Sequence, residues 1–247
     1  MHEGSTAVVI PAKNRAPYLE KAVLSSIHQT RPPQEVYIIV DPSHDGTEAK
    51  AMALSRRFNE VKCILNNKDQ GVAESRNQGI VASTSDYIMF LDSDDVLKPR
   101  YIEKVAALLD QNSKVGMGYS DYVEFGDRNK LIKLPSFDPR LLLVDCFFGW
   151  PVTRRTALEE AGGFDSEQIF EDWELFIRVI GKGWSAMGVS EPLYMWRIHE
   201  LGRDAVGNQR RKEAEDMIYQ KHRLLYDKYK IGRTKDGKWI NTPSPWR

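Results

Sequence analysis

The chain is short of cysteine, of net charge and of long hydrophobic runs. Its two cysteines, Cys63 and Cys146, stand too far apart in the sequence to form a metal-binding pair, which favours a reduced, cytoplasmic setting. Lysine and arginine total 35, as do aspartate and glutamate, so no excess charge favours nucleic acid as a partner. No apolar run approaches the roughly 18 residues that span a bilayer. We therefore expect no nucleic acid partner, no transmembrane segment and no signal peptide.

Two common nucleotide-binding motifs are also absent. No Gly-x-Gly-x-x-Gly follows the first apolar run, which disfavours the usual dinucleotide fold, and without Gly-x-x-x-x-Gly-Lys-Ser/Thr the chain is not a phosphate-loop NTPase. What is present is a regular alternation of apolar runs and helical spacing through the first 95 residues. We predict strands at 6–10, 36–40, 61–65 and 87–91, with helices at 17–27, 47–59 and 71–80. This order predicts an α/β fold with a mostly parallel sheet flanked by helices.

The rest of the chain has shorter, mixed elements, typical of a smaller antiparallel region. We predict helices at 99–111, 141–148, 154–161 and 171–180, and strands at 115–125, 131–134, 150–153, 184–189 and 193–198. Residues 210–229 form a charged helix with an apolar stripe, through which a homo-oligomer would pack, and a loose tail follows from 232. The expected domain is 1–207, with halves 1–98 and 99–207, and 208–247 is a C-terminal helix and tail.

The stretch Asp92-Ser93-Asp94-Asp95 follows a strand predicted to be buried on both faces. Three carboxylates in four residues repel one another unless a cation lies among them. Mg²⁺ or Mn²⁺, held by one or two carboxylates and by the oxygens of a bound phosphate, would offset this repulsion. Asp41 ends the second predicted strand, so both groups of acids should lie at the same edge of the sheet, where open α/β sheets bind ligands. The alternative is a solvated turn, with Asp95 capping the next helix.

Several short motifs occur together and in a fixed order. They are Val9-Ile10-Pro11-Ala12-Lys13-Asn14-Arg15, Val40-Asp41-Pro42-Ser43-His44-Asp45-Gly46-Thr47, Gly71-Val72-Ala73 with Ser75-Arg76-Asn77-Gln78-Gly79, Phe90-Leu91-Asp92-Ser93-Asp94-Asp95, Gly162-Gly163-Phe164-Asp165, Glu171-Asp172-Trp173-Glu174-Leu175 and Arg197-Ile198-His199. Through these motifs, about residues 5 to 200, the chain resembles the family 2 glycosyltransferases of the GT-A fold. Pro42 departs from the usual Asp-Asp-Gly-Ser form of the second motif, in which Val40 would also be acidic.

The resemblance implies an inverting, metal-dependent transfer of a sugar from a nucleoside-diphosphate sugar, most often UDP-linked, to a hydroxyl group. The residues that it assigns to the nucleotide are Pro11, Ala12, Asn14, Asp41, Arg76, Asp92 and Ser93. It assigns Asp94 and His199 to Mn²⁺ or Mg²⁺. A surface ion pair is the alternative for Arg76, and a structural role is the alternative for His199.

For catalysis, the resemblance implies that Asp172 is the general base and that Glu171 touches a donor or acceptor hydroxyl. The alternative is that both are favourable acids at a helix N-terminus. Trp150 and Trp173 are either platforms for sugar stacking or core residues. Arg203 would reach the phosphates from a loop that closes over the donor.

Two other functions remain open at this stage. One is a sugar-phosphate nucleotidyltransferase, although such enzymes usually carry a glycine-rich loop after the first strand and residues 11–15 contain no glycine. The other is a non-catalytic nucleotide- or carbohydrate-binding module. The acceptor could be a carbohydrate, a lipid-linked molecule or a protein. We expect a cytoplasmic enzyme of polysaccharide biosynthesis, peripheral at the inner face of the membrane if its acceptor lies there.

Overall fold

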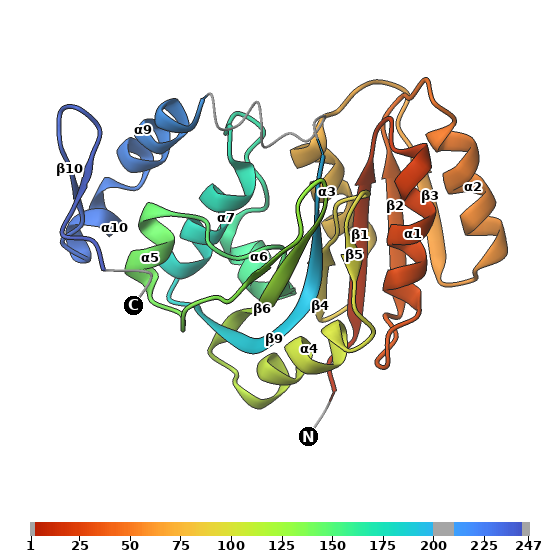
Figure 1. Ribbon diagram of the computed structural model, residues 1–247, viewed down its shortest axis with the longest axis horizontal. Helices are drawn as coiled ribbons and strands as arrows, with labels where there is room; N and C mark the ends of the chain where they lie inside the picture. Colours follow the sequence, from red (N-terminus) through yellow and green to blue (C-terminus); the bar gives the residue numbers. More distant parts are fainter. Residues whose placement is uncertain (1–2, 200–209, 244–247) are drawn as a thin grey trace.

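The computed structural model describes residues 3–199 and 210–243, and one mixed sheet organises most of them (Figure 1). The strand order is β3-β2-β1-β4-β8-β6-β9-β5, and β7 pairs with β6. These strands are β1 (Thr6–Ala12), β2 (Glu35–Val40), β3 (Val61–Leu65), β4 (Tyr87–Phe90), β5 (Val96–Leu97), β6 (Val115–Gly126), β7 (Lys130–Ile132), β8 (Val152–Arg154) and β9 (Ser185–Ile198). The predicted α/β fold with a mostly parallel first half and a smaller antiparallel region is confirmed.

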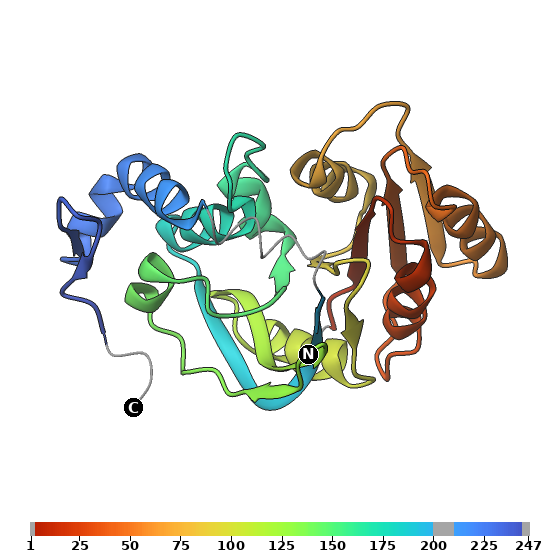
Figure 2. The same cartoon turned by 45° about the horizontal axis from the view of Figure 1, so that its top comes forward.

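The helices cover both faces of this sheet. Those of the two main halves are α1 (Ala16–Ile27), α2 (Thr47–Arg57), α3 (Val72–Ala82), α4 (Tyr101–Gln111), α5 (Pro139–Val144), α6 (Arg155–Ala161) and α7 (Glu171–Gly181). Right-handed crossovers from β1 through β2 to β3 put α1 and α2 on one face, and the return from β3 to β4 puts α3 on the other (Figure 2). Every residue of β1 is buried, as its apolar sequence requires.

The order of the first four strands creates the ligand-binding edge. β1 pairs in parallel with β2 on one side and with β4 on the other, so the order in which successive strands are added to the sheet reverses at β1. The loops that follow β2 and β4 therefore flank the carboxyl end of β1. This arrangement explains why Asp41 and the acidic loop 92–95, which are far apart in the sequence, belong to the same edge of the sheet.

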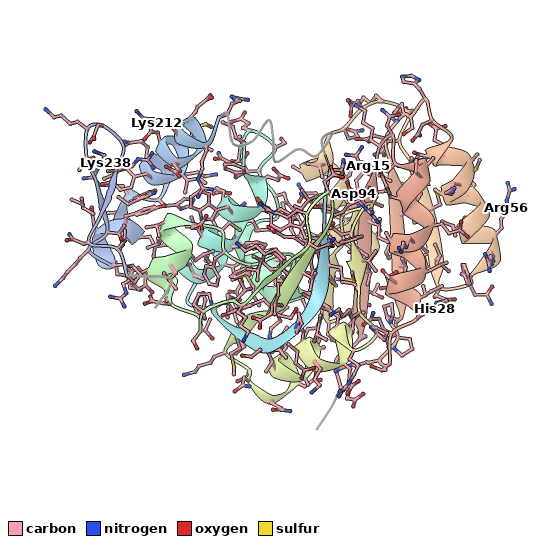
Figure 3. The ribbon with its side chains drawn as sticks, in the orientation of Figure 1. Arg15, His28, Arg56, Asp94, Lys212 and Lys238 are labelled. Atoms are coloured by element: carbon pink, nitrogen blue, oxygen red, sulfur yellow. The ribbon has the colours of Figure 1, made fainter. Side chains whose placement is uncertain are left out.

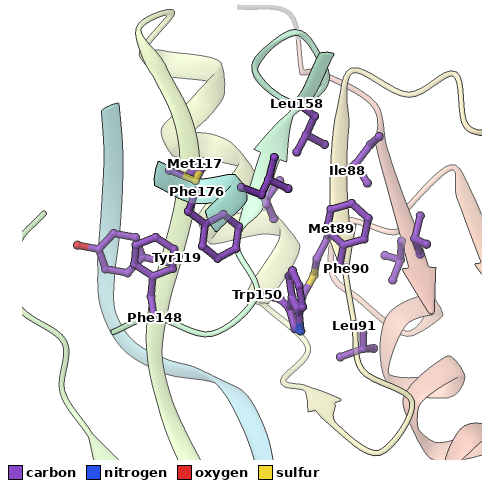
Figure 4. Close-up of a cluster of buried hydrophobic side chains, with 14 of the residues drawn as sticks. Ile88, Met89, Phe90, Leu91, Met117, Tyr119, Phe148, Trp150, Leu158 and Phe176 are labelled. Carbon is purple, nitrogen blue, oxygen red and sulfur yellow. The ribbon is translucent and has the colours of Figure 1, made fainter. Parts of the chain in front are cut away.

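Part of the hydrophobic core lies where β4, β6 and β8 meet α7. Figure 4 shows Trp150 next to Phe90 and Phe176, and the ring centroids of Phe90 and Trp150 are 5.5 Å apart. Tyr119 of β6 stacks on Phe148 at 4.9 Å. The helix predicted at 141–148 is therefore shorter than expected: α5 ends at Val144. Phe147 and Phe148 follow it and are buried in this aromatic core.

Strand β9 is a single element where the sequence predicts two. The proline in Glu191-Pro192 suggests a break, yet Pro192 pairs with Asp121 of β6 at an irregularity in the register, and the strand continues to Ile198. Proline is tolerated at such irregularities because the ladder there does not need its missing N–H. The β6 and β9 strands consequently run side by side over most of their length and reach the ligand-binding edge together.

The C-terminal part differs from its prediction. It forms α9 (Arg211–Lys221), α10 (Arg223–Lys228) and a hairpin of β10 (Gly232–Arg233) and β11 (Trp239–Ile240), so a loose tail from 232 is wrong for these residues. Trp239 stacks on Tyr226 at 5.4 Å, and the Tyr226 hydroxyl donates to the Leu143 carbonyl. Ala214 and Ile218, from the stripe that prompted the oligomer prediction, are buried within the chain. No helix among the described residues is long and apolar enough to cross a membrane.

Glu174 of α7 joins the C-terminal helices to the main sheet. Its fully buried carboxylate accepts hydrogen bonds from Arg178 and His222 and lies 2.9 Å from the Lys221 ammonium. Burial raises the pKa of Glu174, but these three partners outweigh it and lower the pKa to about 2. The stabilisation by this carboxylate is therefore complete above about pH 4.5 and is lost as pH falls towards 2.

We expect Glu174→Gln to lower the free energy of unfolding at neutral pH by about 2 kcal/mol, because Arg178, Lys221 and His222 lose their charged acceptor. Since acid also neutralises the carboxylate of the unsubstituted chain, the difference between the two proteins should shrink as pH falls from about 4.5 towards 2. Urea denaturation across this range measures it. Glu167→Gln, at an exposed turn, is the control. A difference that stays constant with pH would contradict the assignment.

Candidate functional site

Asp41 follows β2 and belongs to one side of the site, the Asp41 wall, which it forms together with Pro11, Ala12 and Asn14. Its carboxylate is 4% exposed and accepts hydrogen bonds from the Asn66 amide at 2.8 Å and from the Gly71 backbone N–H at 3.0 Å. Gly71 has φ of +80°, a value that favours glycine, and it precedes α3. The four lone-pair positions of a carboxylate leave further acceptor capacity on Asp41 for a ligand.

The end of β1 supplies the other residues of this wall. Pro11 and Ala12 are buried in β1, and the Ala12 carbonyl accepts the Asp41 backbone N–H. Asn14 has φ of +51°, and its side-chain oxygen accepts the N–H of His44. The Asn14 side chain thus fixes the loop after β2. The structure brings these predicted nucleotide residues together along one edge.

Asp94 is the point where three separate segments meet. Its Oδ2 atom lies 3.0 Å from Nε2 of His199, which is 105 positions away in the sequence, and 3.1 Å from Nε of Arg15. Figure 3 shows Arg15 and Asp94 close together at the top of the sheet. The Arg197 guanidinium donates to the Asp94 backbone carbonyl. The two predicted metal residues are therefore neighbours. Arg15 and Arg197 also belong to the site, although the sequence suggested no role for them.

Asp95 holds the acidic loop to β9. Its carboxylate is 3% exposed and accepts hydrogen bonds from the Tyr194 hydroxyl and from the Arg197 backbone N–H. Burial, followed by the charges of Asp92 and Asp94, raises the pKa of Asp95 well above its usual value. The alternative of a helix cap is wrong, because α4 begins at Tyr101 and is preceded by Arg100.

Arg76 is a buried link between the two halves. Its side chain is fully buried, and its two terminal nitrogens donate to Asp92 at 2.8 Å and to Glu171 at 2.6 Å. Its guanidinium carbon lies 4.0 Å from the centroid of the Trp150 ring. The alternative of a surface ion pair is therefore wrong, because this cation has almost no contact with solvent. Asp92 accepts a second hydrogen bond from the Trp150 indole N–H.

The first two residues of α7 have different surroundings. Glu171 is 7% exposed and receives the Arg76 hydrogen bond, whereas Asp172 is only partly buried and accepts the N–H of Trp173. Asp172 also lies near Cys146: burial first, and then the negative charge of Asp172, raise the pKa of the Cys146 thiol. Of the two acids, Asp172 is the one with access to solvent and hence to a reacting group.

The aromatic candidates do not present open ring faces. Trp173 is 2% exposed and donates to the Leu142 carbonyl, and Trp150 is buried between Arg76 and the aromatic core. The core alternative therefore holds for both, and the stacking alternative does not. Ser93 is buried inside the acidic loop. Arg203 lies outside the described residues.

The donor set suits a hard divalent cation only in part. Asp94 and His199 offer one carboxylate oxygen and one imidazole nitrogen at adjoining positions. Among the described residues no group of three or more His, Cys, Asp or Glu side chains could hold a metal ion. The residues therefore fit an ion that takes its remaining ligands from a bound diphosphate and water, as Mg²⁺ commonly does.

Comparison with known proteins agrees with this fold. The model of the family described as "Glycosyl transferase family 2" matches residues 7–164. An uncharacterized glycosyltransferase of Haemophilus influenzae is 26% identical over 96% of this chain and 78% of its own length. The chain belongs to glycosyl transferase family 2, and it is a glycosyltransferase.

Two solved structures share the GT-A fold. The mannosyltransferase PcManGT from Pyrobaculum calidifontis, in complex with GDP-Man and Mn²⁺, has a TM-score of 0.68 and 18% identity, and the match covers 89% of this chain and 64% of that one. Staphylococcus aureus TarS 1-349, in complex with UDP-GlcNAc, has a TM-score of 0.67 and 17% identity, with 81% and 60% covered. The chain thus spans less than two thirds of either solved chain.

Proposed function

We propose that the protein is an inverting, metal-dependent glycosyltransferase that moves a sugar from a nucleoside-diphosphate sugar to a hydroxyl group, with Asp172 as general base. The observation that carries this proposal is that Asp41, Asp92 and Asp94 lie at one sheet edge and that Arg76 links Asp92 to Glu171 at the start of α7. That edge is where an open α/β sheet binds its ligand.

The nucleotide would lie against the Asp41 wall. Asp41 would accept a hydrogen bond from the base, and Pro11, Ala12 and Asn14 would line the base and ribose. Asp92 and Ser93 would lie near the ribose and the diphosphate. We propose UDP as the carrier, by analogy with the family and with the UDP-GlcNAc bound to TarS, although the GDP-Man bound to PcManGT makes GDP the necessary comparison.

Asp94 and His199 would hold Mn²⁺ or Mg²⁺. When bound, the ion would act as a Lewis acid that stabilises negative charge on the departing diphosphate. The cationic side chains of Arg15 and Arg197, which already contact Asp94, would keep the acidic loop in place around that charge.

Asp172 would remove the proton from the acceptor hydroxyl as its oxygen attacks the anomeric carbon. Attack from the face opposite the leaving diphosphate inverts the configuration at that carbon, through a transition state with oxocarbenium character. Glu171 would not serve as the base, because its carboxylate is buried and engaged by Arg76. It would position the start of α7 relative to the donor.

The acceptor would be a carbohydrate, a lipid-linked molecule or a protein, in polysaccharide biosynthesis. For its location we propose the cytoplasm, with peripheral contact at the inner face of the membrane. Charge supports that contact: residues 210–243 contain ten Lys or Arg and five Asp or Glu, an excess of five positive charges in a chain that is neutral overall. Segments with an excess of positive charge are attracted to anionic lipids.

A thermal-shift panel tests the donor site. We expect UDP with Mn²⁺ to raise the melting temperature more than either alone, because a ligand stabilises the folded state that it binds. GDP with Mn²⁺ is the comparison for the base. In Asp94→Asn the extra shift due to Mn²⁺ should disappear, while any shift by UDP alone remains.

The matched control is Asp86→Asn, an acid at the opposite end of β4 that binds Ser5. It should respond to UDP and Mn²⁺ as the unsubstituted protein does. An undiminished Mn²⁺ effect in Asp94→Asn would remove Asp94 from the metal site. The absence of a shift with every nucleoside diphosphate would count against the proposed function itself.

A further inference from the structure

One face of the paired strands β6 and β9 is directed towards the acidic loop 92–95. The register pairs Tyr122 with Tyr194 and Glu124 with Trp196, so these four side chains share one face of the sheet. The Tyr194 hydroxyl binds Asp95, and its ring lies against Gly149, where an added Cβ would meet it at 3.4 Å. The face is therefore directed at the acidic loop and at the segment that precedes β8.

Two aromatic rings on this face are partly exposed. The ring centroids of Tyr122 and Trp196 are 5.5 Å apart with an angle of 56° between the planes. Both side chains are less buried than the neighbouring Tyr194, which lies in the core. Two tilted rings at a ligand-binding edge offer apolar faces of the kind on which the C–H groups of a sugar ring pack.

Glu124 lies beside these rings with one oxygen unused. It is 6% exposed, and Arg128 donates to its Oε1 atom. Within residues 3–199 and 210–243, its Oε2 atom is buried and has no hydrogen-bond partner. A buried carboxylate oxygen without a partner is costly, and a ligand hydroxyl that donates to it would satisfy it.

Segment 145–146 connects this face of β6 and β9 to Asp172. Arg211 donates to Asp145 at 2.7 Å and its guanidinium carbon lies 5.8 Å from the Trp173 ring centroid, so Asp145 is held next to the start of α7. Burial first, and then the charges of Glu124, Asp145 and Cys146, raise the pKa of Tyr122. The negative charge of Asp172 likewise raises the pKa of the Cys146 thiol. Segment 145–146 therefore lies close to both Tyr122 and Asp172.

We propose that Tyr122, Glu124 and Trp196 form the subsite for a sugar ring of the acceptor, with Tyr122 and Trp196 packing on the ring and Glu124 accepting a hydrogen bond from one of its hydroxyls. This inference rests on the proposed function, and it commits to a carbohydrate acceptor. The three residues are specificity-determining: they choose and orient the acceptor, and Asp172 removes its proton.

Binding of simple glycosides tests the subsite without knowledge of the natural acceptor. The probes are 4-nitrophenyl α- and β-glycosides of glucose, galactose, mannose and N-acetylglucosamine, observed by saturation-transfer difference NMR with UDP and diamagnetic Mg²⁺ present. We expect the unsubstituted protein to bind at least one of them. In Glu124→Gln the binding should weaken about tenfold or more, since a charged acceptor is lost without a change of size, and Trp196→Ala should have a similar effect.

Two controls keep the result specific. Glu191→Gln changes a glutamate of the partner strand β9, one that pairs with Lys104 away from this face, and should bind the glycoside normally. Trp196→Phe keeps an aromatic ring and should bind the glycoside more strongly than Trp196→Ala. If Trp196→Ala does not fold, Trp196→Phe is measured in its place.

The outcomes separate this inference from the proposed function. Failure of every glycoside to bind the unsubstituted protein, or equal binding by Glu124→Gln and Glu191→Gln, would overturn the subsite. The UDP thermal shift, measured on the same samples, reports the donor site independently. A protein that binds the glycosides but no nucleoside diphosphate would keep the subsite as a carbohydrate site and would refute the donor half of the proposal.

Discussion

Replacement of Asp172 by asparagine is expected to lower sugar transfer by about a thousandfold and to leave nucleotide binding unchanged. A positioned general base contributes roughly a hundredfold to ten-thousandfold to a reaction rate. Asparagine has nearly the same shape but does not take up the hydroxyl proton. Asp172 belongs to the first turn of α7 and is partly exposed, so its loss should not disturb the buried links around it. Release of nucleoside diphosphate from sugar nucleotides measures the effect, with UDP binding followed by thermal shift.

Asp165→Asn serves as the matched control for this experiment. Asp165 lies on the turn before α7 and pairs with Lys221, so its substitution removes a nearby carboxylate without touching the proposed base. We expect this variant to turn over the donor at a normal rate. Full activity in Asp172→Asn would exclude Asp172 from the mechanism. Tight UDP binding without any turnover by the unsubstituted protein would favour the non-catalytic alternative.

Substitution of Arg76 should have the largest effect on stability. In Arg76→Met the carboxylates of Asp92 and Glu171 lose a fully buried cationic partner, and breaking a buried ion pair from one side typically costs about 3–5 kcal/mol. The free energy of unfolding of Arg76→Lys should fall between those of Arg76→Met and the unsubstituted protein. One ammonium group then replaces a planar guanidinium that reaches both acids. Urea denaturation of the ligand-free protein measures the free energy of unfolding.

Arg100→Met is the control for Arg76. Arg100 pairs with Glu103 on the exposed side of α4, and an exposed pair contributes little to stability. If Arg76→Met unfolded at the same urea concentration as the unsubstituted protein, the link between the two halves would have no energetic role. A further substitution, Glu171→Gln in the Arg76→Met background, should recover part of the loss, because one of the two carboxylates that lost Arg76 becomes a neutral amide.

The sequence was sufficient for much of the fold because its first half obeys simple rules. Apolar runs such as 87–91 are long enough for a buried strand and too short for a helix, and the polar turns between them mark the ends of the strands. The acidic cluster at 92–95 indicated a ligand edge because three carboxylates cannot be buried together without compensation. The family resemblance added Asp172 and His199, which no local rule assigns.

What the sequence did not reveal depends on long-range contacts. Arg76 meets Glu171 across 95 positions, and nothing in its helix distinguishes it from a surface arginine. The C-terminal hairpin exists because Trp239 packs on Tyr226, a pairing that local propensity does not predict. Asp95 resembles a helix cap in sequence, but its partners are Tyr194 and Arg197 on another strand.

The last residues of β9 have a consequence for engineering. Trp196 lies on the face shared with Glu124, the next residue, Arg197, contacts Asp94, and His199 follows two positions later. A chimaera that exchanges this whole strand end between relatives would therefore alter residues of the proposed acceptor subsite and of the proposed donor site at once. Redesign directed at one side should change single alternate positions, leaving 197 and 199 untouched.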